Sequence, residues 1–368
     1  MNTHEEWVRN AWYVVAWSEE VTQEKPLGRD ILGKSVVMFR SPEGDSVVMD
    51  NRCAHRGFPL SEGRTTERGI QCGYHGFEYD SAGKCVRVPG QWRIPPGGRQ
   101  RVYPVVESHR WIWAWFGEPE LADPATVPDT HWMDSPDWDR VTHTRLIDCN
   151  AGLLNDNLLD LTHESFLHTS TIGDDAVFEN GVTIEVEDNI VSVDRFMPDC
   201  YPSPLFAKVT SAETVDRWHT TEFQLPAVHI IHAGVVEPRG RREDGFRFEV
   251  LNAITPAKQG QSWYFYAFCR NFEVGSEEMN AVLTKSQGTV LDEDAWALEH
   301  QQQSHENSQE EFEDVLIAQD AGVAMARRVM NHLLDAEREE LAQSKNTERT
   351  VGQPGSTSAV RPEQVRAL

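Results

Sequence analysis

The sequence predicts an α+β protein in which an all-β domain precedes a second domain made of an antiparallel sheet covered by helices. Three observations support this fold class. The first hundred residues are short alternating apolar runs separated by Gly, Pro and Asp turns, strand-length segments recur between residues 183 and 270, and long proline-free segments with helical spacing of apolar residues follow. With 368 residues, 39% of them hydrophobic, the chain is long enough for two domains with separate cores.

Charge and cysteine content limit the partners and the compartment. Lys and Arg number 34 against 59 Asp and Glu, and the net charge of −25 argues against a nucleic-acid partner. No apolar run approaches the roughly 20 residues that cross a bilayer, and the N-terminus lacks the blocks of a signal peptide, so we expect no membrane association and a cytoplasmic location. The six scattered cysteines fit a reducing compartment better than a disulfide scaffold.

Residues 1–116 are predicted to form the first domain. Alternating residues at 35–39 and 47–49 predict strands, and 110–116 predicts a final strand whose tryptophans pack in a core. Prolines then punctuate residues 117–139, which indicates an irregular connection between domains.

Two loops of the first domain carry metal-ligand residues. Cys53-Ala54-His55 is followed, after sixteen intervening residues, by Cys72-Gly73-Tyr74-His75. Two Cys and two His could form a structural zinc site. One Cys and one His per loop is, however, what a [2Fe–2S] cluster with two Cys on one iron and two His on the other requires. The glycines beside these ligands would let backbone amides approach the cluster.

These two loops carry a family resemblance. Cys53-x-His55-Arg56-Gly57 with Cys72-Gly73-Tyr74-His75-Gly76 resembles the Rieske motif of ring-hydroxylating oxygenases. Respiratory Rieske proteins have an additional cysteine in each loop, and this sequence has none there. The resemblance implies that residues 1–116 are a Rieske [2Fe–2S] domain with Cys53, His55, Cys72 and His75 as cluster ligands.

A second site is indicated by Asn155–His168, which sets two histidines, two aspartates and two asparagines among large apolar residues. Buried polar groups need partners. His163 and His168, with a carboxylate from elsewhere, would form the two-histidine, one-carboxylate set that holds non-haem Fe(II), although a helix that happens to carry two histidines is the alternative. Residues five apart point about 140° from each other on an ideal helix, so we predict that the helix is broken or widened between Glu164 and Leu167.

The same stretch resembles the Asp-x-x-His-x-x-x-x-His motif of Rieske oxygenase catalytic domains. The resemblance implies that His163 and His168 bind the mononuclear iron, that Asp160 receives the electrons, and that Asn157 lies near the iron. The third ligand comes from a distant helix, where the resemblance favours Asp294, with Asp292 and Glu293 as alternatives. Carboxylates that stabilise a helix N-terminus are the other explanation for this acidic cluster.

The second domain is predicted over residues 140–342, and the resemblance implies a helix-grip-like catalytic fold. Strands are expected at Thr183–Arg195, Thr220–Val236, Phe246–Thr255 and Ser262–Arg270. Helices are expected at Glu277–Gln303 and Asp314–Glu340. Residues 343–368, rich in Ser, Thr, Gln, Gly and Pro, are predicted to form a mobile tail.

The chain contains no recognisable dinucleotide or flavin motif, so electrons for dioxygen activation must come from a separate reductase. The resemblance implies a reductase that carries flavin and a plant-type [2Fe–2S] centre and oxidises NAD(P)H. It also implies a head-to-tail homotrimer, in which His75 of one chain meets Asp160 of the next.

Further segments resemble the vanillate O-demethylase oxygenases, among them Asn10–Val14, Lys25–Arg29, Val215–Trp218, Ile254–Pro256 and Arg270–Phe272. The implied reaction is O-demethylation of a methoxylated aromatic acid such as vanillate, which gives the phenol and formaldehyde. Two alternatives stay open. The same metals could hydroxylate a methyl or ring carbon of another aromatic or heterocyclic compound, or the chain could be an electron-transfer protein with a non-catalytic second domain.

The residues that bind the substrate are less clear from the sequence. Asn252 is a polar residue on an apolar strand face and His229 lies inside an apolar run, so either could contact the substrate or be satisfied within the core. Arg217, Arg247 and Arg270 could each meet an aromatic carboxylate, and the sequence does not distinguish among them.

Overall fold

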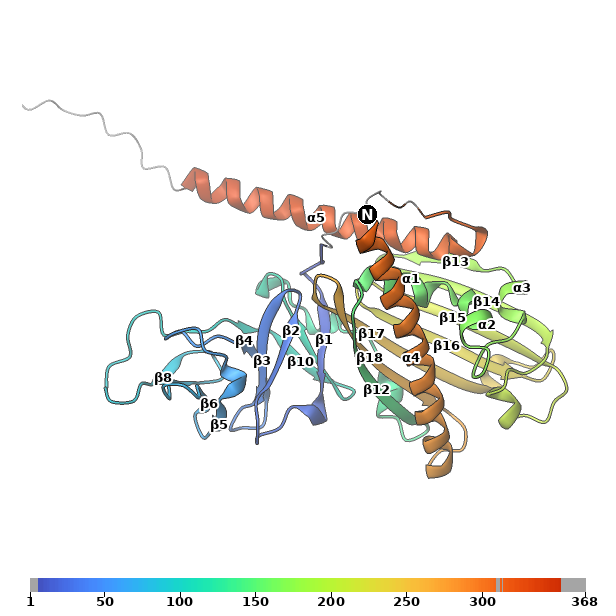
Figure 1. Cartoon of the computed structure of the whole chain (residues 1–368), viewed down its shortest axis with the longest axis horizontal. Helices are drawn as coiled ribbons and strands as arrows, with labels where there is room; N and C mark the ends of the chain where they lie inside the picture. The colour runs from blue at the N-terminus through green and yellow to red at the C-terminus, as the bar shows by residue number, and fades with distance from the viewer. Residues whose placement is uncertain (1–5, 309–311, 313, 352–368) are drawn as a thin grey trace, which may run out of the picture.

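The computed structural model in Figure 1 describes residues 6–308, 312 and 314–351. The N-terminal strands form one end of the molecule, and a seven-stranded sheet crossed by helix α4 forms the other (Figure 1). The predicted α+β fold class is confirmed. Within the described residues, no helix has the combination of length and apolarity that crossing a membrane would require.

The N-terminal part contains three small antiparallel sheets. Their strand orders are β1(Trp12–Trp17)-β11(Trp111–Trp115)-β10(Val105–Ser108), β2(Leu27–Ile31)-β3(Lys34–Arg40)-β4(Ser46–Asp50)-β9(Val102–Tyr103) and β5(Arg64–Thr66)-β6(Gly69–Gln71)-β7(Glu78–Tyr79)-β8(Cys85–Arg87). The strands predicted at 35–39, 47–49 and 110–116 are β3, β4 and β11. Trp111 and Trp113 are completely buried, which confirms that these tryptophans are core residues.

Residues 117–139 contain short 3-10 helices, η3(Pro119–Leu121), η4(Pro124–Thr126) and η5(His131–Met133). The first two begin with proline, whose fixed φ and missing N–H suit the first helical position. The other 3-10 helices of the described chain are η1(Ser18–Glu20), η2(Leu60–Glu62), η7(Phe206–Lys208), η8(Arg242–Asp244) and those given below.

The large sheet is antiparallel throughout, in the order β12-β18-β17-β16-β15-β14-β13. Its strands are β12(Asp139–Ile147), β13(Thr183–Glu187), β14(Ile190–Cys200), β15(Val215–Gln224), β16(Val228–Val236), β17(Phe246–Lys258) and β18(Gln261–Arg270). Two predicted single strands are hairpins: 183–195 turns at Asp188, where φ is +50°, and 220–236 turns at Leu225-Pro226. Strand β12 was missed by the sequence prediction.

The helices are α1(Ala151–Leu159), η6(Leu161–His163), α2(Glu164–Leu167), α3(Ala176–Glu179), α4(Glu277–Asn307), η9(Ala318–Asp320) and α5(Ala321–Val351). The helix predicted at 277–303 is α4, capped by the Ser276 side chain, which accepts a hydrogen bond from the Met279 amide. Helix α5 begins at Ala321, later than the predicted 314. It continues to Val351, so the predicted tail begins inside a helix; residues 352–368 lie outside the described part.

The large sheet has two apolar faces, and each is covered differently. One face packs against β1 and β11, and the hydroxyl of Thr255 donates to the carbonyl of Val14 at 2.7 Å, so β17 ties the two parts together. The other face packs against α1 and α4. The candidate active site lies on this second face.

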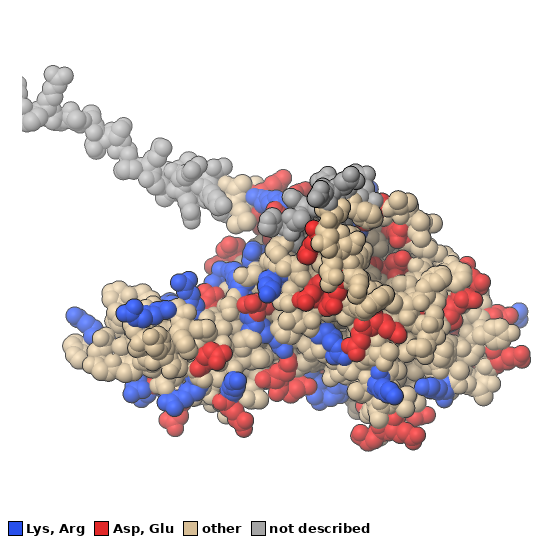
Figure 2. All heavy atoms as spheres, in the orientation of Figure 1, with Lys and Arg blue, Asp and Glu red and all other residues tan. Residues whose placement is uncertain are grey.

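Charge is distributed unevenly over the surface. Residues 52–101, in the N-terminal part, contain nine Lys or Arg and only four Asp or Glu, although the whole chain has a net charge of −25. Blue Lys and Arg side chains are accordingly frequent at the end of the molecule formed by the N-terminal strands (Figure 2).

Candidate metal centres

The two cysteine loops share one backbone frame. In the first loop, the amide of Cys53 donates to the carbonyl of Phe58 at 2.9 Å, and the amide of Gly57 donates to the carbonyl of Cys53 at 2.8 Å. In the second loop, the amide of Cys72 donates to the carbonyl of Phe77 at 2.8 Å, and the amide of Gly76 donates to the carbonyl of Cys72 at 3.1 Å. Gly57 and Gly76 have φ values of +70° and +71°, a region that non-glycine residues rarely adopt. Both cysteines are therefore presented by the same tight turn.

The two loops show the same pattern of burial, with a buried cysteine and an exposed histidine in each. The thiols of Cys53 and Cys72 are buried, whereas His55 and His75 are exposed, with ring centroids 4.5 Å apart. Burial raises the pKa of the Cys72 thiol, so metal binding has to displace its proton. Two buried thiols beneath two exposed imidazoles suit a [2Fe–2S] cluster reached by a redox partner from the surface.

Tyr79 on β7 lies beneath the first loop. Its hydroxyl accepts a hydrogen bond from the Ala54 amide at 3.0 Å and lies 3.3 Å from Cys53 Sγ, which leaves the O–H to donate to the sulfur. The sequence analysis missed this residue, because no motif spacing marks a tyrosine seven residues after Cys72.

The histidine segment does not continue helix α1. The helix ends at Leu159, Asp160 adopts φ −109° and ψ 89°, and its carboxylate accepts from the amide of Thr162 at 3.0 Å at the start of η6. The predicted break between Glu164 and Leu167 is wrong, because these residues form the regular turn α2, which ends at Leu167, just before His168. The chain leaves the helical path before His163 and again at His168, and this lets both imidazoles face α4.

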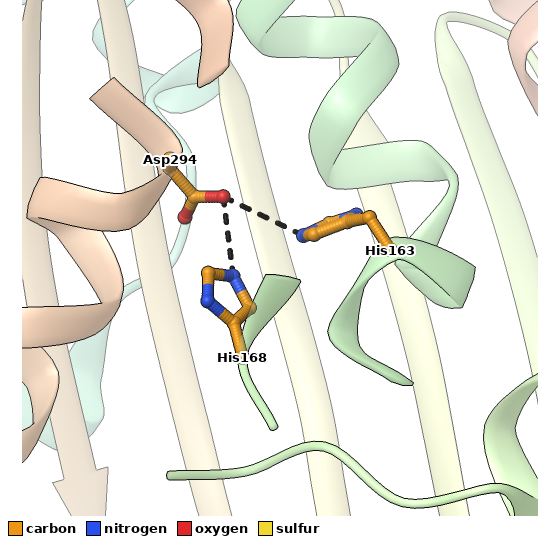
Figure 3. A group of neighbouring side chains, drawn as sticks. All are labelled: His163, His168 and Asp294. Atoms are coloured by element: carbon orange, nitrogen blue, oxygen red, sulfur yellow. Dashed lines mark ion pairs between the residues drawn. The ribbon is translucent and has the colours of Figure 1, made fainter. Parts of the chain in front are cut away.

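His163, His168 and Asp294 converge on one point (Figure 3). Oδ1 of Asp294 lies 3.5 Å from Nε2 of His163 and 3.2 Å from Nε2 of His168. His168 Nε2 is buried and, among the described residues, has no aligned hydrogen-bond partner. Three ligand atoms that lie within 4.8 Å of one another fit the two-histidine, one-carboxylate set of non-haem iron, with positions left open.

Neighbouring groups orient both histidines. Nδ1 of His163 lies 2.7 Å from the carbonyl oxygen of Asp160, and Nδ1 of His168 lies 2.7 Å from Oε2 of Glu293. Each contact holds a proton on Nδ1 and turns the Nε2 lone pair toward Asp294, which is how ligand histidines are usually oriented. Burial lowers the pKa of His163. Burial opposes protonation of His168 too, but Asp294 and Glu293 raise its pKa overall.

The remaining predicted residues near this site can also be located. The amide nitrogen of Asn157 lies 3.3 Å from Asp294 Oδ1 and 3.5 Å from His163 Nε2. Of the alternative third ligands, Asp292 is exposed and pairs with Arg145 at 2.9 Å, and Glu293 contacts His168 on the side away from Asp294. Asp294 is thus the carboxylate that meets both Nε2 atoms.

A cavity opens beside these groups, between the sheet and the helices. Its apolar walls include Leu158, Leu161, Phe206, Ile231, Phe248 and Phe268, and its polar walls include Ser203, Arg217, His219, Tyr264, Tyr266 and Gln287. The flat aromatic side chains, together with polar groups on the same walls, suit a small aromatic ligand that carries polar substituents.

The two residues predicted to bind the substrate, Asn252 and His229, lie in different places relative to the cavity. Asn252 lines the cavity, but its Oδ1 accepts from the Tyr264 hydroxyl at 2.7 Å and its Nδ2 donates to the Val250 carbonyl at 3.1 Å. His229 does not line the cavity: it is fully buried, lies 3.0 Å from Asn155 Oδ1 and stacks on Phe223. Protein partners thus account for the polar groups of Asn252, whereas His229 is bonded through Nε2 and lies away from the cavity.

The three arginines are also separated by the structure. Arg270 is completely buried and pairs with Asp139 at 3.2 Å, and Arg247 lies over the ring of Trp138. Only Arg217 of the three lines the cavity. His219, two residues further along β15, was missed, although strand alternation puts it on the same face.

Comparison with known proteins agrees with this architecture. Residues 11–104 match the Rieske [2Fe–2S] domain, and residues 147–336 match the vanillate O-demethylase oxygenase C-terminal domain. The match to the Rieske model decides against the zinc alternative.

Similar proteins cover nearly the whole chain. The vanillate O-demethylase oxygenase subunit of Pseudomonas sp. (strain HR199 / DSM 7063) is 34% identical, over 90% of this chain and 96% of its own. The toluene-4-sulfonate monooxygenase system iron-sulfur subunit TsaM1 of Comamonas testosteroni is 32% identical, over 90% and 98%. The crystal structure of dicamba monooxygenase bound to dicamba superposes with a TM-score of 0.85 at 31% identity, covering 90% of this chain and 99% of that one.

Another structure of dicamba monooxygenase holds a non-haem iron, and the Rieske domain carries a [2Fe–2S] cluster, so these are the two cofactors of this chain. As an oxygenase component, it works with a separate reductase. The chain is a Rieske non-haem iron oxygenase of the vanillate O-demethylase oxygenase family.

Proposed function

We propose that the protein O-demethylates a methoxylated aromatic acid of the vanillate type. One methyl ether, one O2, two electrons and two protons give the phenol, formaldehyde and water. The observation that carries the proposal is the group of His163, His168 and Asp294 on the wall of a cavity with aromatic side chains. Vanillate and dicamba O-demethylase components among the relatives support a methyl ether as the substrate.

The assignment of the metals to residues is part of this proposal. Cys53, His55, Cys72 and His75 would hold the [2Fe–2S] cluster, supported by two loops of equal backbone geometry. His163, His168 and Asp294 would hold the mononuclear iron, supported by ligand atoms that lie within 4.8 Å of one another. The iron supplies dioxygen activation when bound.

The surrounding residues would orient and protect the reaction. Asp160 and Glu293 hold the two imidazoles through Nδ1, and Asn157 places an amide beside the Asp294 carboxylate. Phe206, Phe248 and other apolar residues would hold the ring and limit water in the cavity. The hydroxylated methyl ether is a hemiacetal, which collapses to phenol and formaldehyde.

Electron supply is proposed to pass between chains. His75 and Tyr74 are exposed, and Asp160 is only half-buried, so both ends of a contact between two copies are accessible. A head-to-tail homotrimer would put His75 of one chain against Asp160 of the next. The reductase is proposed to carry flavin and a plant-type [2Fe–2S] centre, and the basic residues 52–101 would suit an acidic electron donor.

A second candidate keeps both metals but hydroxylates a methyl or ring carbon. The toluene-4-sulfonate monooxygenase subunit among the relatives favours this reaction for a branch of the family. The products separate the two candidates, because only demethylation releases formaldehyde.

The test is turnover of a panel of methoxybenzoates and methylbenzoates with a surrogate reductase and NADH. Formaldehyde in a 1:1 ratio to the phenol is the expected result. Hydroxylated product without formaldehyde would support the second candidate. Three irons per chain, falling to two in His163→Ala, are expected from the metal assignment; two irons with no loss in that variant would favour an electron-transfer protein.

A further inference from the structure

Two polar residues on strand β15 line the cavity and are not used by the metal centres. Arg217 and His219 are 2% and 4% exposed and lie on the same face of the strand. Both border the cavity that also receives His163, His168 and Asp294. A buried cation and imidazole on the wall of an apolar cavity need an explanation.

Hydrogen bonding between them fixes the tautomer of His219. Nε and Nη2 of Arg217 lie 3.1 and 2.8 Å from Nε2 of His219. A guanidinium group can only donate, so Nε2 accepts and the imidazole proton resides on Nδ1. Burial, together with the charge of Arg217, lowers the pKa of His219, which keeps the ring neutral.

The Nδ1–H group is left without a partner. Nδ1 is buried and, in the part of the chain that the structure describes, makes no hydrogen bond. The nearest carboxylate oxygen, Oε1 of Glu164, is 4.0 Å away, beyond hydrogen-bond distance. A buried donor with no acceptor is unusual in a folded protein, and a ligand atom is one way to satisfy it.

The charges around this donor include both signs. Arg217 also forms an ion pair with Asp174 and lies 3.5 Å from Oε2 of Glu164. Arg195, which lies directly opposite His219 on the neighbouring strand β14, adds a second buried guanidinium group. The two guanidinium groups offset the carboxylates of Glu164 and Asp174, so the protein leaves no excess negative charge here. The guanidinium of Arg217 is bonded directly to the His219 ring and polarises its Nδ1–H group, so an anionic oxygen would meet a strengthened donor.

Other polar groups of the cavity are less suited to an anion. Tyr264 donates to Asn252, and Tyr266 donates to Gln287, at 2.7 and 2.6 Å. Among the residues that the structure describes, the amide nitrogen of Gln287 is a second donor without a partner, but no cation is bonded to this side chain. His219 is thus the better place for a carboxylate, and Gln287 the competing one.

We propose that Nδ1–H of His219 binds the carboxylate of the aromatic substrate, and that Arg217 is a positioning residue that holds the proton on Nδ1. The inference rests on the proposed function and adds the residue that selects acids over neutral aromatics. In this proposal Arg217 acts through His219, to which its Nε and Nη2 are bonded.

The experiment measures binding by calorimetry to the protein carrying both metal centres, without reductase, so that no turnover occurs. The probes are 4-hydroxy-3-methoxybenzoate and 4-hydroxy-3-methoxybenzyl alcohol, which differ at the carboxylate. His219→Gln keeps an acceptor for Arg217 but removes the Nδ1 donor; His219→Asn keeps a donor near the Nδ1 position. His332→Gln, on the exposed part of α5, is the matched control.

We expect wild type and His332→Gln to bind the acid at least about tenfold more tightly than the alcohol. His219→Gln should lose this preference through weaker binding of the acid alone, and His219→Asn should recover part of it. Wild-type affinity for the acid in a His219→Gln protein with full iron content and an unchanged circular dichroism spectrum would overturn the proposal. So would equal affinity of the wild type for both probes, or loss of the preference in Gln287→Leu but not in His219→Gln.

Turnover separates this inference from the proposed function. Formaldehyde release from the acid by the wild type tests the proposed function, and the comparison of the two probes tests the binding of the carboxylate by His219. Absence of formaldehyde with an intact preference for the acid would overturn the demethylase proposal but not the role of His219.

Discussion

His168 and Glu293 form a hydrogen-bonded pair across 125 residues of sequence: Nδ1 of His168 lies 2.7 Å from Oε2 of Glu293. Glu293 precedes Asp294 on α4, so consecutive residues contact opposite nitrogens of one imidazole, Nδ1 and Nε2. These two contacts hold the ring in one tautomer and one orientation.

Glu293→Ala is therefore expected to weaken iron binding about 10- to 100-fold, because His168 loses its orienting partner. Glu293→Gln keeps an acceptor and should lose less. Iron retention against a chelator measures the effect, with Asp292→Asn, an exposed neighbour paired with Arg145, as the control. Equal iron retention in all three variants would contradict this role.

Asp160→Asn is expected to keep both metals and nearly abolish turnover. Nδ1 of His163 bonds the main-chain carbonyl of Asp160, which the substitution leaves intact, and an amide oxygen can still accept from Thr162. Only the charged carboxylate, the proposed contact for His75 of the neighbouring chain, is lost. Iron content and the cluster absorption spectrum should match wild type while steady-state demethylation falls; a fully active variant would rule out the bridge.

Tyr79→Phe is expected to lower the reduction potential of the cluster. Its O–H is directed to Cys53 Sγ, and a donor to sulfur stabilises the more negative reduced cluster. A hydrogen bond of about 0.5–1.5 kcal/mol corresponds to about 20–65 mV for one electron.

Redox titration followed by the cluster spectrum measures this shift. Tyr103→Phe, which removes a hydroxyl bonded to Asp50 rather than to a cysteine, is the control and should leave the potential unchanged. A Tyr79→Phe potential equal to or above the wild-type value would show that the hydroxyl does not act on the sulfur.

His232 is expected to make stability depend on pH in the alkaline range. Burial opposes its charge, but the carboxylates of Glu222, 3.6 Å from Nε2, and Glu249, hydrogen-bonded to Nδ1 at 2.5 Å, raise its pKa to about 9. Its folded pKa exceeds the unfolded value of 6.5, so the stabilisation is fully present below pH 6.5 and is lost as pH rises through about 9.

Urea unfolding at several pH values tests this dependence. At pH 6 the free energy of unfolding of the wild type should exceed that of His232→Gln by a few kcal/mol in order of magnitude, and this difference should become smaller by about pH 10. A difference that stays constant over this range would show that His232 stabilises by packing against Trp132 and not by charge.

Local patterns predicted most of the elements but not all of their ends. Alternation located the strands around 36, 48 and 113, yet two hairpins were read as single strands, although Asp188 and Leu225-Pro226 are turn signals. The break at Asp160 also had a local signal, because Asp is a preferred N-cap and here accepts from the Thr162 amide.

The candidate site was less accessible to sequence reasoning where it depends on pairs far apart in the chain. Spacing and resemblance suggested His163, His168 and Asp294, which the structure brings together. No periodicity could pair His168 with Glu293, or reveal that Asn252 is bonded by Tyr264. These contacts arise only when α4 and the strands pack together.

The two cysteine loops have the same main-chain hydrogen bonds and the same glycine conformation, but their histidines occupy different positions in the loop. His55 is two residues after Cys53, and His75 is three residues after Cys72, while both glycines are four residues after their cysteine. The main chain therefore fixes the sulfurs symmetrically, and a single-residue difference in position directs each imidazole. For protein engineering, this makes histidine position an adjustable variable: moving it by one residue in either loop would redirect a ring while both sulfurs keep their places.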